Sequence, residues 1–230
     1  MKAYWVKTHR IIKGLFSNLI WDIPNTEKKI YLTFDDGPTS EITEWVLNQL
    51  EQYNAKATFF CIGKNIEQHP EIFKKVIENG HAIGNHTFNH LNGWKTTTNE
   101  YIENFELCEV AISNQKCFAS SLSLGSEINP EISGLKSKIF RPPYGKIKAA
   151  QAKKLRQKGY KIIMWDVLSA DFDQSITKEA CLDNVVSNTQ SGSIIVFHDS
   201  VKAFKNLEYA LPKVLQHLAE HHFSFETIKQ

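Results

Sequence analysis

Carboxylate and histidine side chains gather in two short motifs in the first half of the chain. Asp35 and Asp36 are adjacent and precede Gly37-Pro38, a combination typical of a sharp turn after a strand. Two neighbouring carboxylates repel each other, which favours a bound cation or protonation of one partner. His86 and His90 stand at i and i+4, so both can reach one metal ion from a single helical turn. With Asp36 they would form a His₂Asp set that leaves positions open for water and substrate, as catalytic zinc sites require.

Two later motifs carry further polar side chains beside apolar runs. Arg141 and Tyr144 lie in Phe-Arg-Pro-Pro-Tyr-Gly, and His198 ends the run Ile-Ile-Val-Phe-His. Taken singly, each motif has an ordinary interpretation: a plain Asp-Gly turn, surface histidines, a surface ion pair for Arg141 and a hydrogen-bonded strand-end histidine for His198. Their joint occurrence after apolar runs favours one shared site.

Apolar runs and amphipathic stretches alternate after Pro24, as expected of βα units around a parallel sheet or barrel. The expected strands are 30–34, 57–62, 81–84, 160–165, 193–197 and 223–228. The expected helices are 41–53, 70–79, 99–114, 148–158, 178–188 and 207–221. Loops after the strands carry the site in such folds, and the polar motifs follow strands. The sequence therefore predicts that the motifs converge.

Length and composition indicate one globular domain. The chain has 230 residues, 42% of them hydrophobic and 23% charged, and no Pro/Gly/Ser-rich linker divides it. We expect a single catalytic domain over residues 25–230, with residues 1–24 packed on it. A net charge of +2 gives no electrostatic case for nucleic acid, and no run is apolar enough to span a membrane. The sequence carries no signal of an oligomeric state.

The N-terminal segment is basic and has an amphipathic pattern. Its cations are Lys2, Lys7, Arg10 and Lys13, and its apolar side chains at helical spacing are Ile12, Leu15, Phe16 and Leu19. It lacks the apolar run of roughly 7–15 residues that a secretory signal needs, so we expect a cytoplasmic protein. We expect a helix packed against the domain. The alternative is contact with a membrane surface, where basic amphipathic helices also bind.

Two further features lie outside the polar motifs. The four cysteines, Cys61, Cys108, Cys117 and Cys181, form no Cys-x-x-Cys pair, so we expect mostly buried free thiols, with a Cys108–Cys117 disulfide as the alternative. Residues 117–138 are rich in Ser, Gly, Asn and Glu and interrupt the alternation of strands and helices. Such a long loop is typical of either a functional insertion or a disordered segment.

The motifs, in this order, resemble the polysaccharide deacetylase family that shares the NodB homology domain, also called carbohydrate esterase family 4. The resemblance runs from about residue 30 to residue 228 and matches the opening motif at 33–37, the histidine motif at 86–90 and the Arg-x-Pro-Tyr motif at 141–144. The late histidine motif is matched at 196–198, with Val in place of the usual Leu. The resemblance implies an α/β fold, a distorted and incomplete (β/α) barrel.

The resemblance also implies a cofactor. Asp36, His86 and His90 would bind one divalent metal ion, most often Zn²⁺, with Co²⁺, Ni²⁺ or Mn²⁺ as alternatives. The backbone N–H of Tyr144 would help to stabilise the oxyanion.

Three other residues have proton-transfer roles by the same resemblance. Asp35 would be the general base, Arg141 would hold and orient it, and His198 would be the general acid. This division suits amide hydrolysis, which needs a polarised carbonyl, an activated water and a proton for the departing amine.

One motif departs from the family pattern. The family usually carries Asp-x-x-Asp-Trp, whose first Asp pairs with the catalytic histidine. Aligned through Trp165 and Asp171, that position is Leu168 here, and Phe172 replaces the Trp. Asp166 is the first candidate for a substitute because it lies on the same side of an extended strand as Leu168. Asp171 is the second candidate.

Three functions remain in view from the sequence. The resemblance favours a metal-dependent hydrolase that removes N-acetyl groups from N-acetylglucosamine-type sugars or oligosaccharides, with a carbohydrate as its partner. The absence of a secretion signal motivates a metal-dependent amidase or cyclic imide hydrolase that acts on a small cytosolic substrate. Leu168 allows a third function, a carbohydrate-binding protein without catalysis.

Overall fold

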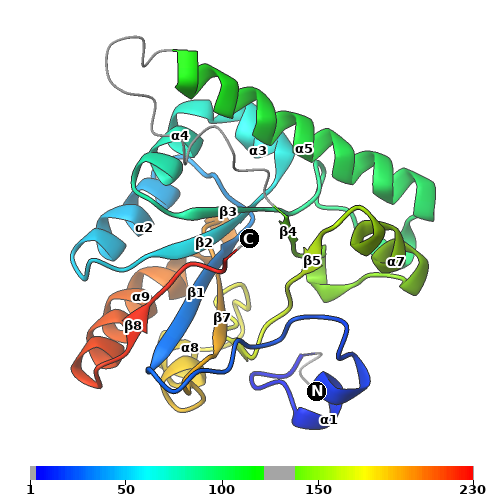
Figure 1. Ribbon diagram of the computed structural model, residues 1–230. Coiled ribbons are helices and arrows are strands. Elements are labelled where there is room, and N and C mark those ends of the chain that lie inside the picture. The colour runs from blue at the N-terminus through cyan, green and yellow to red at the C-terminus, as the bar shows by residue number, and fades with distance from the viewer. Residues whose placement is uncertain (1–3, 122–137, 230) are drawn as a thin grey trace.

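The strands of the computed structural model form one curled sheet with helices on its outside (Figure 1). The structure describes residues 4–121 and 138–229. The strands are β1 (Lys29–Asp35), β2 (Ala57–Cys61), β3 (Ala82–Asn85), β4 (Ile139–Phe140), β5 (Lys161–Ile162), β6 (Val167–Leu168), β7 (Ile194–His198) and β8 (Ser224–Phe225). The sheet order is β5-β4-β3-β2-β1-β7-β6, with β8 beside β1, and the strands pair in parallel. The predicted fold, a distorted and incomplete (β/α) barrel, is confirmed.

Helices cover the outside of this sheet. They are α1 (Arg10–Leu15), α2 (Ile42–Glu51), α3 (Gly63–Gln68), α4 (Pro70–Glu78), α5 (Thr98–Ser121), α7 (Ala149–Gln157), α8 (Lys178–Val186) and α9 (Val201–Glu220), with 3₁₀ turns η1 (Gly93–Lys95) and η2 (Pro143–Gly145). Helix α4 illustrates why they form: Pro70 suits the first helical position, and Ile72, Phe73 and Val76 bury one face.

The centre of the sheet is apolar on both of its faces. In β1, β2 and β7 nearly every residue is buried, which explains their continuous runs of aliphatic and aromatic residues. The parallel register sets Asp35 of β1 beside Phe60 of β2 and His198 of β7. The carboxyl ends of these strands therefore lie at one edge of the barrel.

The N-terminal segment lies between β5 and β6, the two ends of the strand order. Ile20 forms a parallel bridge with Ile163 just after β5, and Lys7 forms an antiparallel bridge with Val167 of β6. The Ile20 N–H donates to the Ile162 carbonyl at 2.9 Å. This segment, which runs along the lower right of Figure 1, therefore spans the gap of the incomplete barrel.

A buried carboxylate fixes the segment in place. Asp166 is fully buried, and it accepts from Lys7 Nζ at 2.6 Å, Lys13 Nζ at 2.5 Å and Ser193 Oγ at 2.6 Å. Lys13 also pairs with Asp22. Burial opposes ionisation of Asp166, but Lys13, Lys7 and Ser193 outweigh it and lower the pKa of the carboxyl. Two lysines are thus tied to one buried anion.

Some elements differ from those predicted. Strands β4 and β6 and helix α3 have no predicted counterpart, because a two-residue strand or a single short turn of helix leaves no readable periodicity. Helix α9 begins at Val201 rather than at 207, and α5 continues to Ser121, past the predicted start of the loop at 117. The rest of that predicted insertion, 122–137, lies outside the described residues.

The cysteines agree with the main expectation. Cys61, Cys108 and Cys181 are buried free thiols, so the alternative Cys108–Cys117 disulfide is not formed. Among the described residues, no helix is both long and apolar enough to cross a bilayer.

We predict that Asp166→Asn lowers the free energy of unfolding by about 3 kcal/mol at pH 7, because two lysines then lose their buried anion. Urea denaturation of variant and wild type measures this. The folded-state pKa lies below 3.8, so the stabilisation is present above that value and is lost as pH falls through the lowered pKa. The difference between the two proteins should therefore shrink as the pH falls below 3.8.

Asp22→Asn is the matched control, since Asp22 also accepts from Lys13 but is partly exposed. Its cost should stay below about 1 kcal/mol. Equal costs for the two variants would contradict a special role for Asp166.

Candidate active site

The predicted polar motifs converge at the carboxyl edge of the sheet. Asp35 ends β1 and His198 ends β7, and the two are register partners on neighbouring strands. His86 follows directly on Asn85, the last residue of β3, and Arg141 follows β4. Asn85 is itself the register partner of Phe140, so β3 and β4 end at one level. Residues that are far apart in the sequence thus face one site.

Asp36, His86 and His90 form a group with metal-ligand geometry. Their ligand atoms all lie within 4.8 Å of one another, and theirs is the one such group in the part of the chain that the structure describes. Asp36 Oδ1 is 3.2 Å from His90 Nε2 and 3.7 Å from His86 Nε2. That oxygen is buried without a hydrogen-bond partner. An orphaned anionic oxygen beside two imidazole nitrogens fits a bound divalent cation.

Both histidines have lowered pKa values, which favours the neutral form that can bind a metal ion. Burial lowers the pKa of His86 well below its ordinary value, and His90 lowers it further. Burial also lowers the pKa of His90, although Asp36 opposes this. His86 Nδ1 lies 2.8 Å from the Arg141 carbonyl oxygen, which fixes the ring and leaves Nε2 for a metal.

The backbone around these ligands is constrained. Asp36, His90 and Tyr144 have positive φ angles of 82°, 55° and 59°. Such conformations cost on the order of 1–3 kcal/mol each and persist where the surroundings impose them, often at functional sites. The site residues are therefore held by the fold.

Asp199 holds the turn after β1, and its role is not predicted from the sequence. Its carboxyl accepts from Gly37 N at 3.1 Å and from Thr43 Oγ1 at 2.5 Å. A Cβ on Gly37 would lie 2.0 Å from Asp199 Oδ2, so only glycine fits there. Burial raises the pKa of Asp199 to about 8. No spacing signal distinguishes this residue from an ordinary polar residue after a strand.

Asp35 is paired with a buried guanidinium, as expected. Arg141 is fully buried, and its Nη1 donates to Asp35 Oδ1 at 2.7 Å and to Thr33 Oγ1 at 2.7 Å. Its Nε and Nη2 donate to the carbonyls of Ile163 and Met164. The orientation of Asp35 is thereby fixed.

His198 has a carboxylate partner, and that partner is Asp171. His198 Nδ1 lies 2.7 Å from Asp171 Oδ1, and the backbone N–H of His198 donates to Asp171 Oδ2 at 2.7 Å. Burial lowers the pKa of His198, but Asp171 outweighs it, helped by Asp36 and Asp35, and the pKa rises to about 9.

The first candidate for this partner, Asp166, is wrong. The Asp166 N–H donates to the Ile194 carbonyl, so Asp166 lies four residues below His198 along β7. At roughly 3.3 Å per residue this is about 13 Å, beyond the reach of a carboxylate. Asp166 binds lysines at the opposite end of the barrel instead. Asp171 reaches His198 because it lies in the loop after β6.

Phe172 forms one wall beside His198. Their rings meet edge to face with centroids 5.1 Å apart. On its other side Phe172 contacts the Tyr4 ring at 5.5 Å, and the Tyr4 hydroxyl donates to Asp173 at 2.5 Å. The N-terminal segment therefore reaches His198 through Phe172.

Tyr144 lies on the other side of the site, where its ring is 4.5 Å from that of His90. The N–H groups of Gly145 and Lys146 are used in the turn, on the carbonyls of Pro142 and Pro143. The Tyr144 N–H takes no part in these turn bonds.

The chain is similar to known deacetylases in sequence. Residues 22–121 match the family described as polysaccharide deacetylase. A peptidoglycan-N-acetylglucosamine deacetylase of Bacillus cereus is 34% identical over 211 residues, which cover 91% of each protein. A chitooligosaccharide deacetylase of Azorhizobium caulinodans is 32% identical and covers 77% of this chain and 76% of its own. Other relatives are longer: the chain spans 39% of a Listeria monocytogenes peptidoglycan-N-acetylglucosamine deacetylase.

The chain is also similar in fold to solved structures. A peptidoglycan N-acetylglucosamine deacetylase crystallised with a benzamide ligand superposes with a TM-score of 0.80 at 29% identity, covering 94% of both chains. A pseudoenzyme of carbohydrate esterase family 4 from Bacillus anthracis shares the fold, with a TM-score of 0.74 at 20% identity, covering 91% of this chain and 66% of that one.

We predict that His198 titrates near pH 9 in the metal-free protein and that Asp171→Asn lowers this pKa toward or below 6.5, because the carboxylate that favours the imidazolium is lost. Histidine ring NMR in the presence of a chelator measures it. Asp166→Asn is the control and should leave the titration of His198 unchanged. A shift caused by Asp166→Asn alone would contradict the pairing.

Proposed function

Because the chain belongs to the polysaccharide deacetylase family, that of the NodB homology domain and carbohydrate esterase family 4, we propose that it removes N-acetyl groups from N-acetylglucosamine-type sugars with a divalent metal ion. One observation carries this proposal. The group of Asp36, His86 and His90 is flanked by two ion pairs. Asp35 with Arg141 would supply a base, and His198 with Asp171 would supply an acid. A base and an acid thus face one cation site.

Asp36, His86 and His90 would hold the metal. Such an ion, most often Zn²⁺ in this family, supplies carbonyl polarisation and lowers the pKa of a water ligand from about 15.7 to about 7. The His₂Asp set leaves positions open for water and substrate. The neutral state of both imidazoles supports this assignment, because a protonated ring binds no metal.

The chain's own groups would move the protons. Arg141 donates to Oδ1 of Asp35, which leaves Oδ2 of Asp35 free to act as the base. Oδ2 would take a proton from water while the water oxygen bonds to the amide carbon. The Tyr144 N–H would donate to the oxyanion. His198, kept protonated by Asp171, would give its proton to the amine nitrogen as the carbon–nitrogen bond breaks. Acetate and a free amino sugar result.

The names of the relatives support the sugar substrate over the alternatives. Both peptidoglycan N-acetylglucosamine and chitooligosaccharide are N-acetylated glucosamine substrates, whereas no similar protein named above acts on a cyclic imide. The complete set of proton-transfer groups supports catalysis over a purely binding role. The cytoplasmic location expected from the sequence stays a prediction, and the peptidoglycan relatives do not favour it.

We predict that a chelator abolishes acetate release from chitooligosaccharides and that Zn²⁺ restores it. Metal binding by calorimetry gives a second readout: Asp36→Asn should weaken it by more than the roughly 10–100-fold typical of lost supporting groups. Undiminished activity in the metal-free protein would overturn the metal assignment. Faster turnover of a small cyclic imide than of the sugar would overturn the substrate.

We also predict that Asp35→Asn and His198→Gln each lower kcat by roughly 10²–10⁴ while KM changes little, because each removes one proton transfer. Steady-state kinetics on a defined N-acetylglucosamine oligomer measures this. Glu51→Gln, on the exposed side of α2, is the control with wild-type rates. Wild-type kcat in Asp35→Asn would refute its role as the base.

A further inference from the structure

Helix α1 turns two of its apolar residues, Ile11 and Leu15, away from the domain. Lys13 points inward, because its Nζ bonds to the buried Asp166. Side chains two positions away are rotated by about 200°, so Ile11 and Leu15 lie on the opposite face. They are 65% and 72% exposed, and a Cβ on Gly14 would meet nothing within 4 Å. Of the apolar side chains that the sequence places at helical spacing, Ile12 and Leu19 are half-buried, whereas Leu15 and Phe16 are exposed, and α1 itself has no buried residues.

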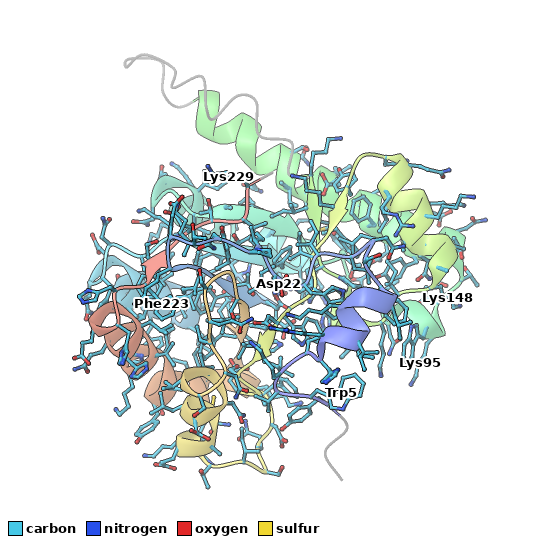
Figure 2. All side chains as sticks on the ribbon, turned by 60° about the horizontal axis from the view of Figure 1, so that its bottom comes forward. Trp5, Asp22, Lys95, Lys148, Phe223 and Lys229 are labelled. Atoms are coloured by element: carbon cyan, nitrogen blue, oxygen red, sulfur yellow. The ribbon has the colours of Figure 1, made fainter. Side chains whose placement is uncertain are left out.

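An apolar cavity of about 270 Å³ lies between α1 and the domain. Ile12 and Phe16 line it from the helix, and Trp94, Ile147 and Met164 line it from the domain. Phe16 and Trp94 remain 51% and 61% exposed. Figure 2 shows Trp5, itself 65% exposed, on the same side of the molecule as α1. We call the exposed apolar residues on this side of the molecule the α1 face: Trp5, Ile11, Leu15, Phe16 and Trp94.

Cations without an ion-pair partner border the α1 face, although Lys148 Nζ donates to the Thr96 carbonyl at 2.7 Å. Arg10, Lys95 and Lys148 are exposed, and Figure 2 shows Lys95 and Lys148 on the side that carries α1. Arg156 lines the cavity, and its Nη1 is buried without a hydrogen-bond partner. None of these four forms an ion pair within the described ranges, whereas Lys158, nearby in sequence, pairs with Glu106. The border is therefore free to bind anions.

We propose that the α1 face docks on a bilayer that contains anionic phospholipid, with Arg156 binding a lipid phosphate at the cavity. Exposed aromatic and aliphatic side chains ringed by cations match such a surface, where apolar groups enter the headgroup boundary and cations attract anionic lipids. The cavity gives an acyl chain an apolar place beside the guanidinium. This inference goes beyond the proposed deacetylase function and does not depend on it.

Docking would bring the active site near the membrane surface. Gly145 lines the cavity and is the neighbour of Tyr144, whose ring contacts His90. The α1 face and the metal-ligand group are therefore joined by one short turn, η2.

Vesicle co-sedimentation of the full chain tests the proposal. We expect binding to mixed phosphatidylcholine and phosphatidylglycerol vesicles, weak binding to phosphatidylcholine alone, and release as salt rises from about 0.1 M to about 1 M. Ile11→Ser with Leu15→Ser should weaken binding roughly tenfold or more, because both side chains enter the interface. Arg156→Gln should weaken binding to the anionic vesicles roughly fivefold, because the guanidinium no longer binds a lipid phosphate.

The matched control is Leu107→Ser with Val110→Ser on α5, whose side chains are 51% and 55% exposed away from the α1 face. It should bind vesicles as the wild type does. Equal loss in the two double variants, or no sedimentation with anionic vesicles, would overturn the proposal. So would equal binding to soluble polyphosphate, or a wild-type dimer that Ile11→Ser with Leu15→Ser converts to a monomer.

Activity separates this proposal from the deacetylase function. Ile11→Ser with Leu15→Ser should hydrolyse soluble chitooligosaccharides at the wild-type rate without vesicles. Asp35→Asn, which is expected to be inactive, should still bind vesicles. Loss of vesicle binding in Asp35→Asn would show that the two properties are not independent and would count against the docking surface.

Discussion

A fully buried guanidinium at the centre of the barrel constrains the whole site. Removing a charge from water costs several kcal/mol unless its nitrogen atoms are hydrogen-bonded and an anion lies beside it. Arg141 meets this requirement through Thr33 and Asp35 on β1 and two carbonyls after β5, and its Cζ lies 4.2 Å from the Phe60 ring centroid. The same bonds that compensate the charge of Arg141 link distant strands and fix Asp35 in the orientation that the proposed base requires.

Burial has opposite outcomes for the histidines at this site. His86 and His90 have lowered pKa values because desolvation prevails. His198 is largely shielded from solvent as well, but the adjacent Asp171 carboxylate stabilises its imidazolium and raises the pKa. The environment thus keeps two imidazoles neutral and a third protonated, which is the separation of pKa values that the proposed metal ligands and proposed acid require.

The N-terminal segment contributes to the structure in three ways. It spans the gap between β5 and β6, it is fixed there by Asp166, and it supports Phe172 through Tyr4. Fixing Lys13 inward also decides that Ile11 and Leu15 point outward. A fold shared with a pseudoenzyme does not decide activity, so function depends on the groups placed at the carboxyl edge of the sheet.

The sequence alone determined the long strands, the fold class and the convergence of Asp35, Asp36, His86, His90, Arg141 and His198, because each of these signals is local: an apolar run followed by a polar motif. Tertiary structure decided the rest. Strands β4 and β6 exist only through pairing with longer neighbours, and the choice of Asp171 over Asp166 depends on the level at which β6 meets β7. The orientation of α1 depends on a contact between residues 153 positions apart. Periodicity cannot reveal such contacts, since it reports only which side of one element is apolar.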